Sequence, residues 1–344
     1  MAGTQVVDVI KPERYARYSQ LLTEEKTEVL QSGAMVRDPR LDAFLAVGGG
    51  VTFNMPAWKD LTRSRSKIVT DELIGVNDIA PDKIAAIKEL AVRLSRAMAW
   101  SDTDLAAALA GDDPMDAITQ LTSGYWAADL QAHFIATWAG VFADNAAAPT
   151  GTEHVQNDLI HDVKGSSFSD DVTNFTGKNL IGATLKMGDS MKKLRLIMVH
   201  SVVFATMQIK NLIDFIPDAR GETDIATYQG KRVIVDDHMP SPSSGIYESW
   251  IFGEGATAFG VGRPRVPVET KRYPEAGQGG GQEALFERYE WVIHPRGHRY
   301  AGTPADGGPS TLTTANNLAH ADSWVRAVPE RKMIAAVKLV TREF

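Results

Sequence analysis

The sequence predicts an α+β protein, and three observations support this fold class. Residues 195–240 pass from an apolar run to helical spacing, a loop and a second β-branched run, which is typical of a mixed sheet flanked by helices. Residues 114–144 have the spacing of one long helix, and residues 46–75 and 266–294 have the alternation of long hairpins. A helix of that length indicates an elongated subunit rather than a compact enzyme.

The composition limits the class of protein. The 344 residues are 44% hydrophobic and 23% charged, which indicates a folded chain of one large domain with arms or of two domains. The net charge of −7 gives no basic surface for tight nucleic-acid binding over the whole molecule. The chain has no cysteine, which excludes disulfides and thiolate chemistry. No apolar run approaches the roughly 18 residues that cross a bilayer, so no membrane partner is expected.

Residues 1–44 are expected to form an arm. Their charges are mixed and their apolar stripe is thin, so they would pack along another surface, in the same chain or in a neighbour, rather than form a core of their own.

Residues 46–75 are expected to form a hairpin with a basic tip. Val51, Phe53 and Met55 alternate with polar residues. Ile68 and Val69 resume the pattern and are predicted to begin the returning strand. The basic and aromatic residues of the tip are Trp58, Lys59, Arg63, Arg65 and Lys67. Such a cluster suits an acidic partner surface or nucleic acid, and a solvated tip is the alternative interpretation.

Residues 80–110 are expected to be helical, with a break. Pro81 suits a helix start, and Ile84, Ile87, Leu90 and Leu94 follow at helical spacing. A second helix is predicted over residues 105–109.

The longest element is expected over residues 114–144. Asp113 can cap the helix, Pro114 takes the first helical position and Asp116 favours the positive end of the helix dipole. Two apolar stripes then follow at spacings of three and four residues, so the helix presents a face wide enough to lie across a sheet. At roughly 1.5 Å per residue it would span about 45 Å. His133 lies between the stripes and is expected on a helix flank rather than as a metal ligand.

Residues 145–151 are a candidate domain boundary, and a further helix is predicted from Thr176 to Lys192–Lys193. His154 and His161, between them, are interpreted as surface residues rather than metal ligands, because no third ligand follows at a fixed spacing.

Residues 195–240 offer the main alternative to a structural role. Ser201 is predicted to cap a helix after a buried strand. The candidate metal ligands of a hydrolase are His200, Asp236, Asp237 and His238. Asp236 and Asp237 are adjacent on a strand end and point to opposite faces, which weakens the hydrolase hypothesis.

The last hundred residues are expected to be mainly strands. Residues 246–252 and 334–340 are predicted strands, and residues 276–282 form the tip of the hairpin over 266–294. Residues 294–298 are expected to be a strand-ending turn. The glycines at 253–262 lack the order of a dinucleotide-binding motif.

The chain resembles the major capsid proteins of tailed bacteriophages with the Hong Kong-ninety-seven-type fold. The resemblance depends on the order of six stretches, GGGVTFNMPAWKDL, AGDDPMDAI, MVHSVVFATMQIKNLIDFI, TYQGKRVIVDDHMP, PVETKR and YEWVIHPRG, which are spread over residues 45–300. It implies an N-terminal arm (1–44), an extended loop (45–78), a peripheral domain (79–150 and 258–300) and an axial domain (151–257 and 301–344).

The resemblance also implies a function. The chain would assemble as hexamers and pentamers into an icosahedral head around double-stranded DNA, with the tip of the extended loop contacting neighbouring subunits. Implied partners are further copies, a portal protein, a separate scaffolding protein, a decoration protein and non-specifically held DNA. The protein would be assembled in the host cytoplasm and located in the virion, without cofactor or catalytic residue. A cargo-enclosing encapsulin shares the fold and is the alternative.

Overall fold

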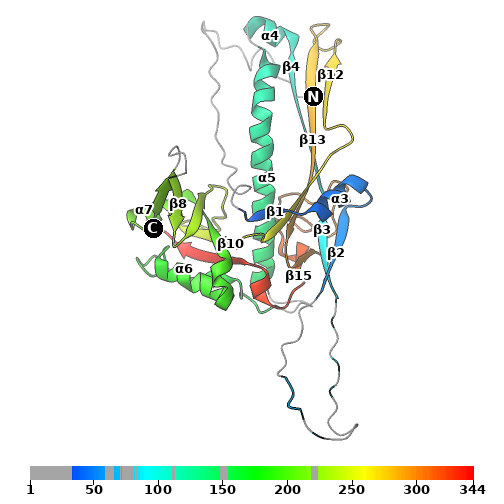
Figure 1. Cartoon of the computed structure of the whole chain (residues 1–344). Helices are drawn as coiled ribbons and strands as arrows, with labels where there is room; N and C mark the ends of the chain where they lie inside the picture. The colour runs from blue at the N-terminus through cyan, green and yellow to red at the C-terminus, as the bar shows by residue number, and fades with distance from the viewer. Residues whose placement is uncertain are drawn as a thin grey trace.

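The computed structural model describes residues 33–58, 66–69, 71, 79, 81, 84, 86–110, 113–147, 154–217 and 224–344. Figure 1 shows an elongated subunit in which one long helix stands between two β-sheets. None of the helices in this part of the chain combines the length and apolar character needed to cross a membrane.

The long helix is α5 (Pro114–Ala146), and its predicted start is confirmed. The Asp113 side chain accepts a hydrogen bond of 2.9 Å from the Met115 N–H, Pro114 lies in the first turn, and Asp116 adds an acidic group near the positive end of the helix dipole. The helix has 33 residues, which corresponds to about 50 Å at roughly 1.5 Å per residue. It therefore reaches both sheets.

The first sheet lies along the N-terminal half of α5 and is organised by β13 (Gln282–Pro295). One edge of β13 pairs with β4 (Leu94–Thr103), and its other edge pairs first with β12 (Val268–Tyr273) and then with β11 (Thr257–Gly262). β1 (Met35–Arg37) adds in parallel to β11. The predicted hairpin over residues 266–294 is confirmed, and its tip extends to the same end of the molecule as α4 (Asp104–Ala110) (Figure 1).

The second sheet has seven strands in the order β5-β16-β10-β6-β9-β8-β7. Its central strands are apolar on both faces, as a doubly covered sheet requires. The strands, in chain order, are β5 (Ile160–Asp162), β6 (Leu194–Val199), β7 (Asp214–Pro217), β8 (Asp224–Tyr228), β9 (Lys231–Val235), β10 (Ile246–Gly253) and β16 (Ala336–Arg342). The strands predicted over 246–252 and 334–340 are therefore confirmed within two residues.

Aromatic residues on α5 join the two sheets into one core. Trp126 lies 6.1 Å from Trp291 of the first sheet, and Phe142 lies 5.5 Å from Trp250 of the second, measured between ring centroids. Between them Trp138 packs on Phe252 and donates a hydrogen bond of 2.9 Å to the hydroxyl of Thr257. Because these rings contact both sheets, α5 lies at the centre of the core that the two sheets share.

The helix predicted over residues 80–110 is wrong for most of its length. The chain forms β3 (Ala86–Val92) and β4 before the short helix α4 begins at Asp104. β3 pairs antiparallel with β2 (Thr52–Trp58), so the returning strand of the extended hairpin is β3 and not the predicted stretch at Ile68–Val69. Pairing with β2 and β13 satisfies the backbone of both strands and overrides their helix propensity.

The remaining helices follow the predicted order with one corrected cap. Thr176 caps α6 (Gly177–Thr184), which continues as the 3₁₀ segment η1 (Leu185–Lys193). The cap of α7 (Ser201–Ile209) is His200 and not Ser201 as predicted, because the His200 ring nitrogen Nδ1 accepts the Val202 N–H at 3.2 Å. The helix α3 (Pro39–Val47) covers β11 near the extended hairpin.

Residues 301–323 form a loop that is fixed to α5. The buried Arg96 guanidinium donates to the carbonyls of Gly307 and Pro309 and to the His133 ring, which lies between helix and sheet rather than on an exposed flank. Burial lowers the pKa of His133, so its ring stays neutral and can accept from Arg96. In the sequence, the loop connects the paired strands β14 (His298–Tyr300) and β15 (Trp324–Arg326), and it ends in the 3₁₀ turn η2 (Ala321–Ser323). A further 3₁₀ turn, η3 (Arg331–Met333), lies between β15 and β16.

Candidate assembly surfaces

The extended hairpin exposes a large aromatic side chain. Trp58, the last residue of β2, is 68% exposed. Lys67, Ile68 and Val69 are also exposed, so this part of the chain carries basic and apolar groups that the subunit itself does not bury. Exposed aromatic residues such as tryptophan are enriched in protein interfaces. Lys59, Arg63 and Arg65 of the predicted basic tip lie outside the described residues.

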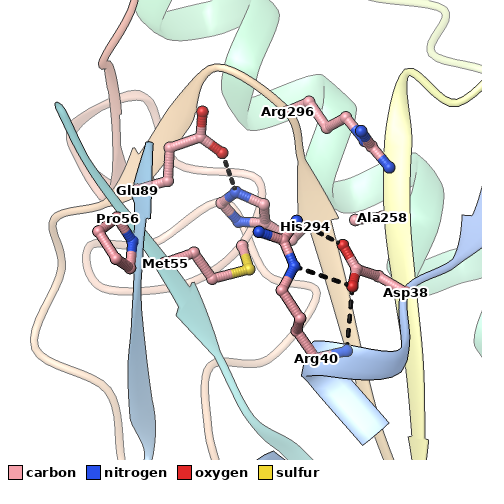
Figure 2. Close-up of a pocket in the computed structure, with 8 residues that line it drawn as sticks. All are labelled: Asp38, Arg40, Met55, Pro56, Glu89, Ala258, His294 and Arg296. Atoms are coloured by element: carbon pink, nitrogen blue, oxygen red, sulfur yellow. Dashed lines mark hydrogen bonds and ion pairs between the residues drawn. The ribbon is translucent and has the colours of Figure 1, made fainter. Parts of the chain in front are cut away.

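The base of this hairpin is held by a carboxylate. Glu89 of β3 accepts a hydrogen bond from the His294 Nε2 at 3.1 Å on one oxygen and from the Gly297 N–H at 3.3 Å on the other. The His294 side chain is 1% exposed and that of Glu89 is 15% exposed. His294 lies at the end of β13 and Gly297 in the turn that follows it, so Glu89 connects the hairpin directly to the first sheet, and Figure 2 shows its contact with His294.

The N-terminal side of the same junction is held by an ion pair. Asp38, the cap of α3, receives hydrogen bonds of 3.1 and 2.8 Å from the Arg40 guanidinium and one of 3.0 Å from the Arg40 N–H. These bonds lower the pKa of the Asp38 carboxyl, which keeps it ionised. Between Arg40, Glu89 and His294 lies a cavity of about 150 Å³ (Figure 2).

A small apolar cluster completes the junction. It is separate from the main core and consists of Leu41, Leu45, Met55, Ala91, Ala258 and Val292. Phe44 of α3 stacks on Phe53 of β2 with ring centroids 4.6 Å apart. The helix α3, the hairpin and the first sheet therefore meet in one joint with its own apolar and polar contacts.

The four residues of the hydrolase hypothesis are held by structural contacts. Asp236 accepts from the Gln131 amide of α5 and from the His238 N–H, and its carboxylate lies 3.2 Å from the His238 ring. Asp237 is exposed, and it accepts from the Ser201 N–H at 3.3 Å and lies 3.9 Å from the His200 ring. The two carboxylates thus have different neighbours. Within the described ranges no three histidine or acidic residues are grouped so that they could hold a metal ion.

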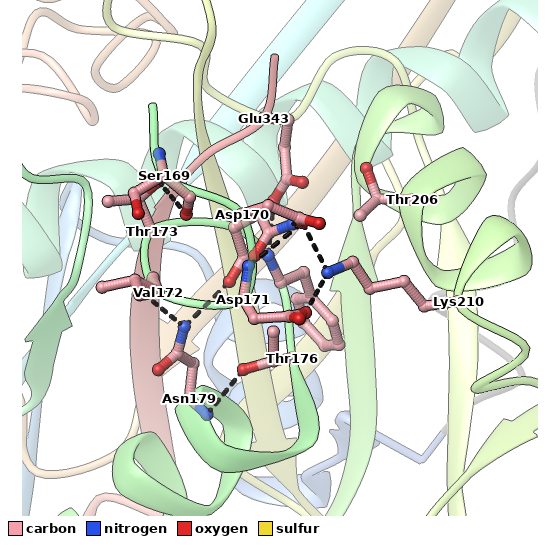
Figure 3. Close-up of polar contacts among 12 residues, drawn as sticks. Ser169, Asp170, Asp171, Val172, Thr173, Thr176, Asn179, Thr206, Lys210 and Glu343 are labelled. Atoms are coloured by element: carbon pink, nitrogen blue, oxygen red, sulfur yellow. Dashed lines mark hydrogen bonds and ion pairs between the residues drawn. The ribbon is translucent and has the colours of Figure 1, made fainter. Parts of the chain in front are cut away.

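A second polar cluster lies between the C-terminal end of the chain, the end of α7 and the segment before α6 (Figure 3). Lys210 at the end of α7 lies 2.7 Å from Asp170 and also pairs with Asp171. The buried Glu343 carboxylate accepts the Phe175 N–H at 2.8 Å. Burial raises the pKa of Glu343 above its ordinary value.

The C-terminal end of α5 is surrounded by buried polar groups. The Arg326 side chain, 1% exposed, donates to both oxygens of Asp158 at 2.9 and 2.7 Å, and Asn145 donates to the same carboxylate at 2.7 Å. Nearby, burial raises the pKa of Asp144 to about 7 and lowers the pKa of His298 to about 3. This network joins α5 to β15.

The solved structures that resemble this chain include capsids of phages. The capsid asymmetric unit of cyanophage Pam1 matches 100% of this chain and 99% of its own with a TM-score of 0.58 at 10% identity. The capsid of Ralstonia phage GP4 matches 99% of each chain with a TM-score of 0.57 at 8% identity. No protein-family model matches the chain. The long helix, the extended hairpin and the two sheets thus define the Hong Kong-ninety-seven-type capsid fold.

The sequence comparison narrows this class. The major capsid protein of Bacillus phage SPP1 is 35% identical over 338 residues, which cover 97% of this chain and 97% of that protein. The chain therefore belongs to the family of the major capsid proteins of tailed bacteriophages.

Sequence reasoning missed the junction residues Glu89 and His294. The sequence pattern predicts a helix at Glu89, and it places His294 at the end of a strand and the start of a turn without a partner. The alternation of Ile87, Glu89 and Ala91 with their neighbours is compatible with a strand, but an apolar pattern this short does not distinguish strand from helix.

Proposed function

We propose that this chain assembles with copies of itself, as hexamers and pentamers, into the icosahedral head that encloses the double-stranded DNA of a tailed phage. The observation that carries the proposal is the 35% identity to a phage major capsid protein along nearly the whole of both chains. The exposed Trp58 and the projecting hairpin support it, because surfaces of this kind are buried only by a neighbouring subunit. The role is structural, and no cofactor or catalytic group is needed for it.

The proposed division of the subunit follows the sequence with one change. The arm takes residues 1–44, the peripheral domain takes 93–150 and 258–300, and the axial domain takes 151–257 and 301–344. The pairing of β2 with β3 favours an extended loop that continues from residue 45 to residue 92 rather than ending at 78.

The proposed partners follow from this role. A portal protein would replace one pentamer, a separate scaffolding protein would guide assembly in the host cytoplasm, and a decoration protein would bind the outside of the virion. The net charge of −7 suits a shell that encloses DNA without gripping its phosphates, because each phosphate contact would need a cation.

Size-exclusion chromatography and negative-stain microscopy of the purified chain test the proposal. We expect closed particles of megadalton mass, and a small oligomer at all concentrations would refute it. Double-stranded DNA and a portal in particles from infected cells would separate a phage head from an encapsulin-like cargo shell, which shares the fold.

A further inference from the structure

The joint at the base of the extended hairpin combines directional and non-directional contacts. The apolar cluster around Met55 and Ala258 holds the hairpin against the sheet, but apolar packing has little directional preference. The two hydrogen bonds of Glu89 do have direction, since each requires a short distance and a near-linear donor. The angle between hairpin and sheet is therefore determined mainly by Glu89.

The cavity beside Glu89 leaves room for that angle to change. Its volume of about 150 Å³ exceeds the roughly 30 Å³ that one water occupies. Five of its eight lining residues are polar or charged, and the lining is formed by Asp38, Arg40, Met55, Pro56, Glu89, Ala258, His294 and Arg296. A small rotation of the hairpin would rearrange water in this space instead of compressing the core.

His294, one of the side chains that line the cavity, supports a small rotation of the hairpin. The second ring nitrogen of His294, Nδ1, is buried and has no hydrogen-bond partner among the residues that the structure describes. Buried polar atoms without partners are uncommon and costly. A shift of the hairpin and of the water beside it could supply that partner. Asp38, in contrast, is fixed by Arg40, so the N-terminal wall of the cavity stays in place.

A shell made of hexamers and pentamers requires one chain to take more than one set of contact angles. We propose that Glu89 is the positioning residue for the extended hairpin and that the cavity beside it gives the hairpin the freedom to fit both kinds of ring. The inference rests on the proposed function and names the place in the subunit where the two conformations differ.

Four variants test the inference. Glu89→Ala removes both hydrogen bonds, and Glu89→Gln keeps the acceptor for Gly297. Lys88→Ala is the matched control, since Lys88 is the exposed neighbour on the opposite face of β3. Ala258→Val fills part of the cavity without touching Glu89. For each variant we would measure thermal unfolding of the unassembled subunit, the yield of closed shells and the distribution of shell diameters by electron microscopy.

We expect Glu89→Ala to fold and to lose roughly tenfold in closed-shell yield, the change that one lost hydrogen bond to a charged group produces in an equilibrium. Open or irregular sheets should replace the shells, and Glu89→Gln should recover most of the yield. Ala258→Val should fold at least as stably as the wild type and also form fewer closed shells.

Two results would overturn the inference. The first is a Glu89→Ala variant with the shell yield and diameters of Lys88→Ala. If Glu89→Ala does not fold, the second such result is an Ala258→Val variant that assembles like the wild type. A wild-type chain that forms no shells would instead refute the proposed function.

Discussion

Arg326 shows how a buried charge can hold two parts of this subunit together. Its guanidinium donates to Asp158 and to the carbonyls of Val328 and Pro329, so all of its nitrogens have acceptors. Asp158 in turn receives Asn145 from the end of α5. A buried ion pair of this kind stabilises a fold little more than well-packed apolar residues would. Removing only one of its partners is strongly destabilising, because the other charge stays buried without a counter-charge.

Replacing Arg326 with Leu should therefore destabilise the subunit. The Asp158 carboxylate would remain buried without its cation, and the loss should be about 3–5 kcal/mol in the free energy of unfolding. Urea unfolding of the unassembled subunit measures this loss. Arg299→Leu is the matched control, because Arg299 is exposed on β14, the strand paired with β15. Equal stability of the two variants would contradict the structural role of the pair.

His298 should make the subunit sensitive to acid. Its pKa is lowered to about 3 by burial and by the nearby Arg326, while the unfolded chain keeps the ordinary histidine value. The unfolded state therefore binds the proton more readily than the folded state does. The contribution of His298 to the free energy of unfolding is fully present above about pH 6.5 and falls as the pH drops towards 3. The loss should be up to about 1.4 kcal/mol per pH unit.

The comparison of wild type with His298→Asn isolates this effect, since the asparagine amide can still donate to the Arg296 carbonyl. The variant should show a smaller fall in stability between pH 6.5 and 4.5. Other groups facing this site are His154, His294 and Arg326, and they are present in both proteins. The raised pKa of Asp144 acts in the opposite direction, because its carboxyl is protonated in the fold up to about pH 7 and so favours the folded state as the pH falls. An unchanged slope in the variant would exclude His298 as the acid-sensitive group.

At the residue scale, the sequence predicts local roles better than long-range ones. The cap and first turn of α5 were predicted because Asp113, Pro114 and Asp116 act within one turn of the chain. The buried pair of Arg326 and Asp158 joins residues 168 positions apart, and nothing in the local pattern of either residue indicates it. The cap of α7 was assigned to Ser201 rather than to His200 for a different reason, since serine is a preferred cap residue and histidine is not, although the His200 contact with Val202 is local.

At the scale of elements, two glycines of α5 should respond in opposite ways to alanine. A Cβ at Gly140 would lie 2.1 Å from the Leu318 carbonyl oxygen, whereas a Cβ at Gly124 would meet nothing within 4 Å. Gly124→Ala should stabilise the unassembled subunit by up to about 1 kcal/mol through helix propensity. Gly140→Ala should destabilise it by roughly 1–3 kcal/mol through overpacking. Thermal unfolding measures both, and equal effects would mean that the loop over residues 301–323 does not lie against the helix.

The elements themselves were predictable where their pattern is long and local. The helix over residues 114–144 and the hairpin over 266–294 were found because many residues repeat one period. Residues 86–103 were assigned to a helix, because Leu90 and Leu94 fit both periods and the strands exist only through pairing with β2 and β13. The joint around Glu89 could not be predicted from the sequence, because it depends on that pairing.

At the scale of the whole molecule, stability and assembly are linked. The described surface includes exposed apolar side chains at both ends of the subunit, such as Leu105 and Leu109 on α4 and Ile181 and Leu185 beside α6. Contacts that bury such groups on a neighbour stabilise the folded state by mass action. The architecture therefore favours a subunit whose projecting parts bury their apolar groups on other copies. Substitutions of contact residues should then change assembly without changing the folding of the single subunit.

The basic tip of the extended loop provides such a test. Arg63 and Arg65 are predicted contact residues outside the described part of the chain, and reversing both to Glu changes the charge of the loop by four units. We expect the double variant to fold with the thermal stability of the wild type and to form few shells, because like charges across an interface cost several kcal/mol and suppress association. The matched control is Lys192→Glu with Lys193→Glu, which makes the same charge change at the exposed end of η1. Sedimentation and negative-stain microscopy give the shell yield of both. A normal yield from the loop variant would exclude contact by Arg63 and Arg65, and an equal loss from the control would show that net charge rather than contact by the loop governs assembly.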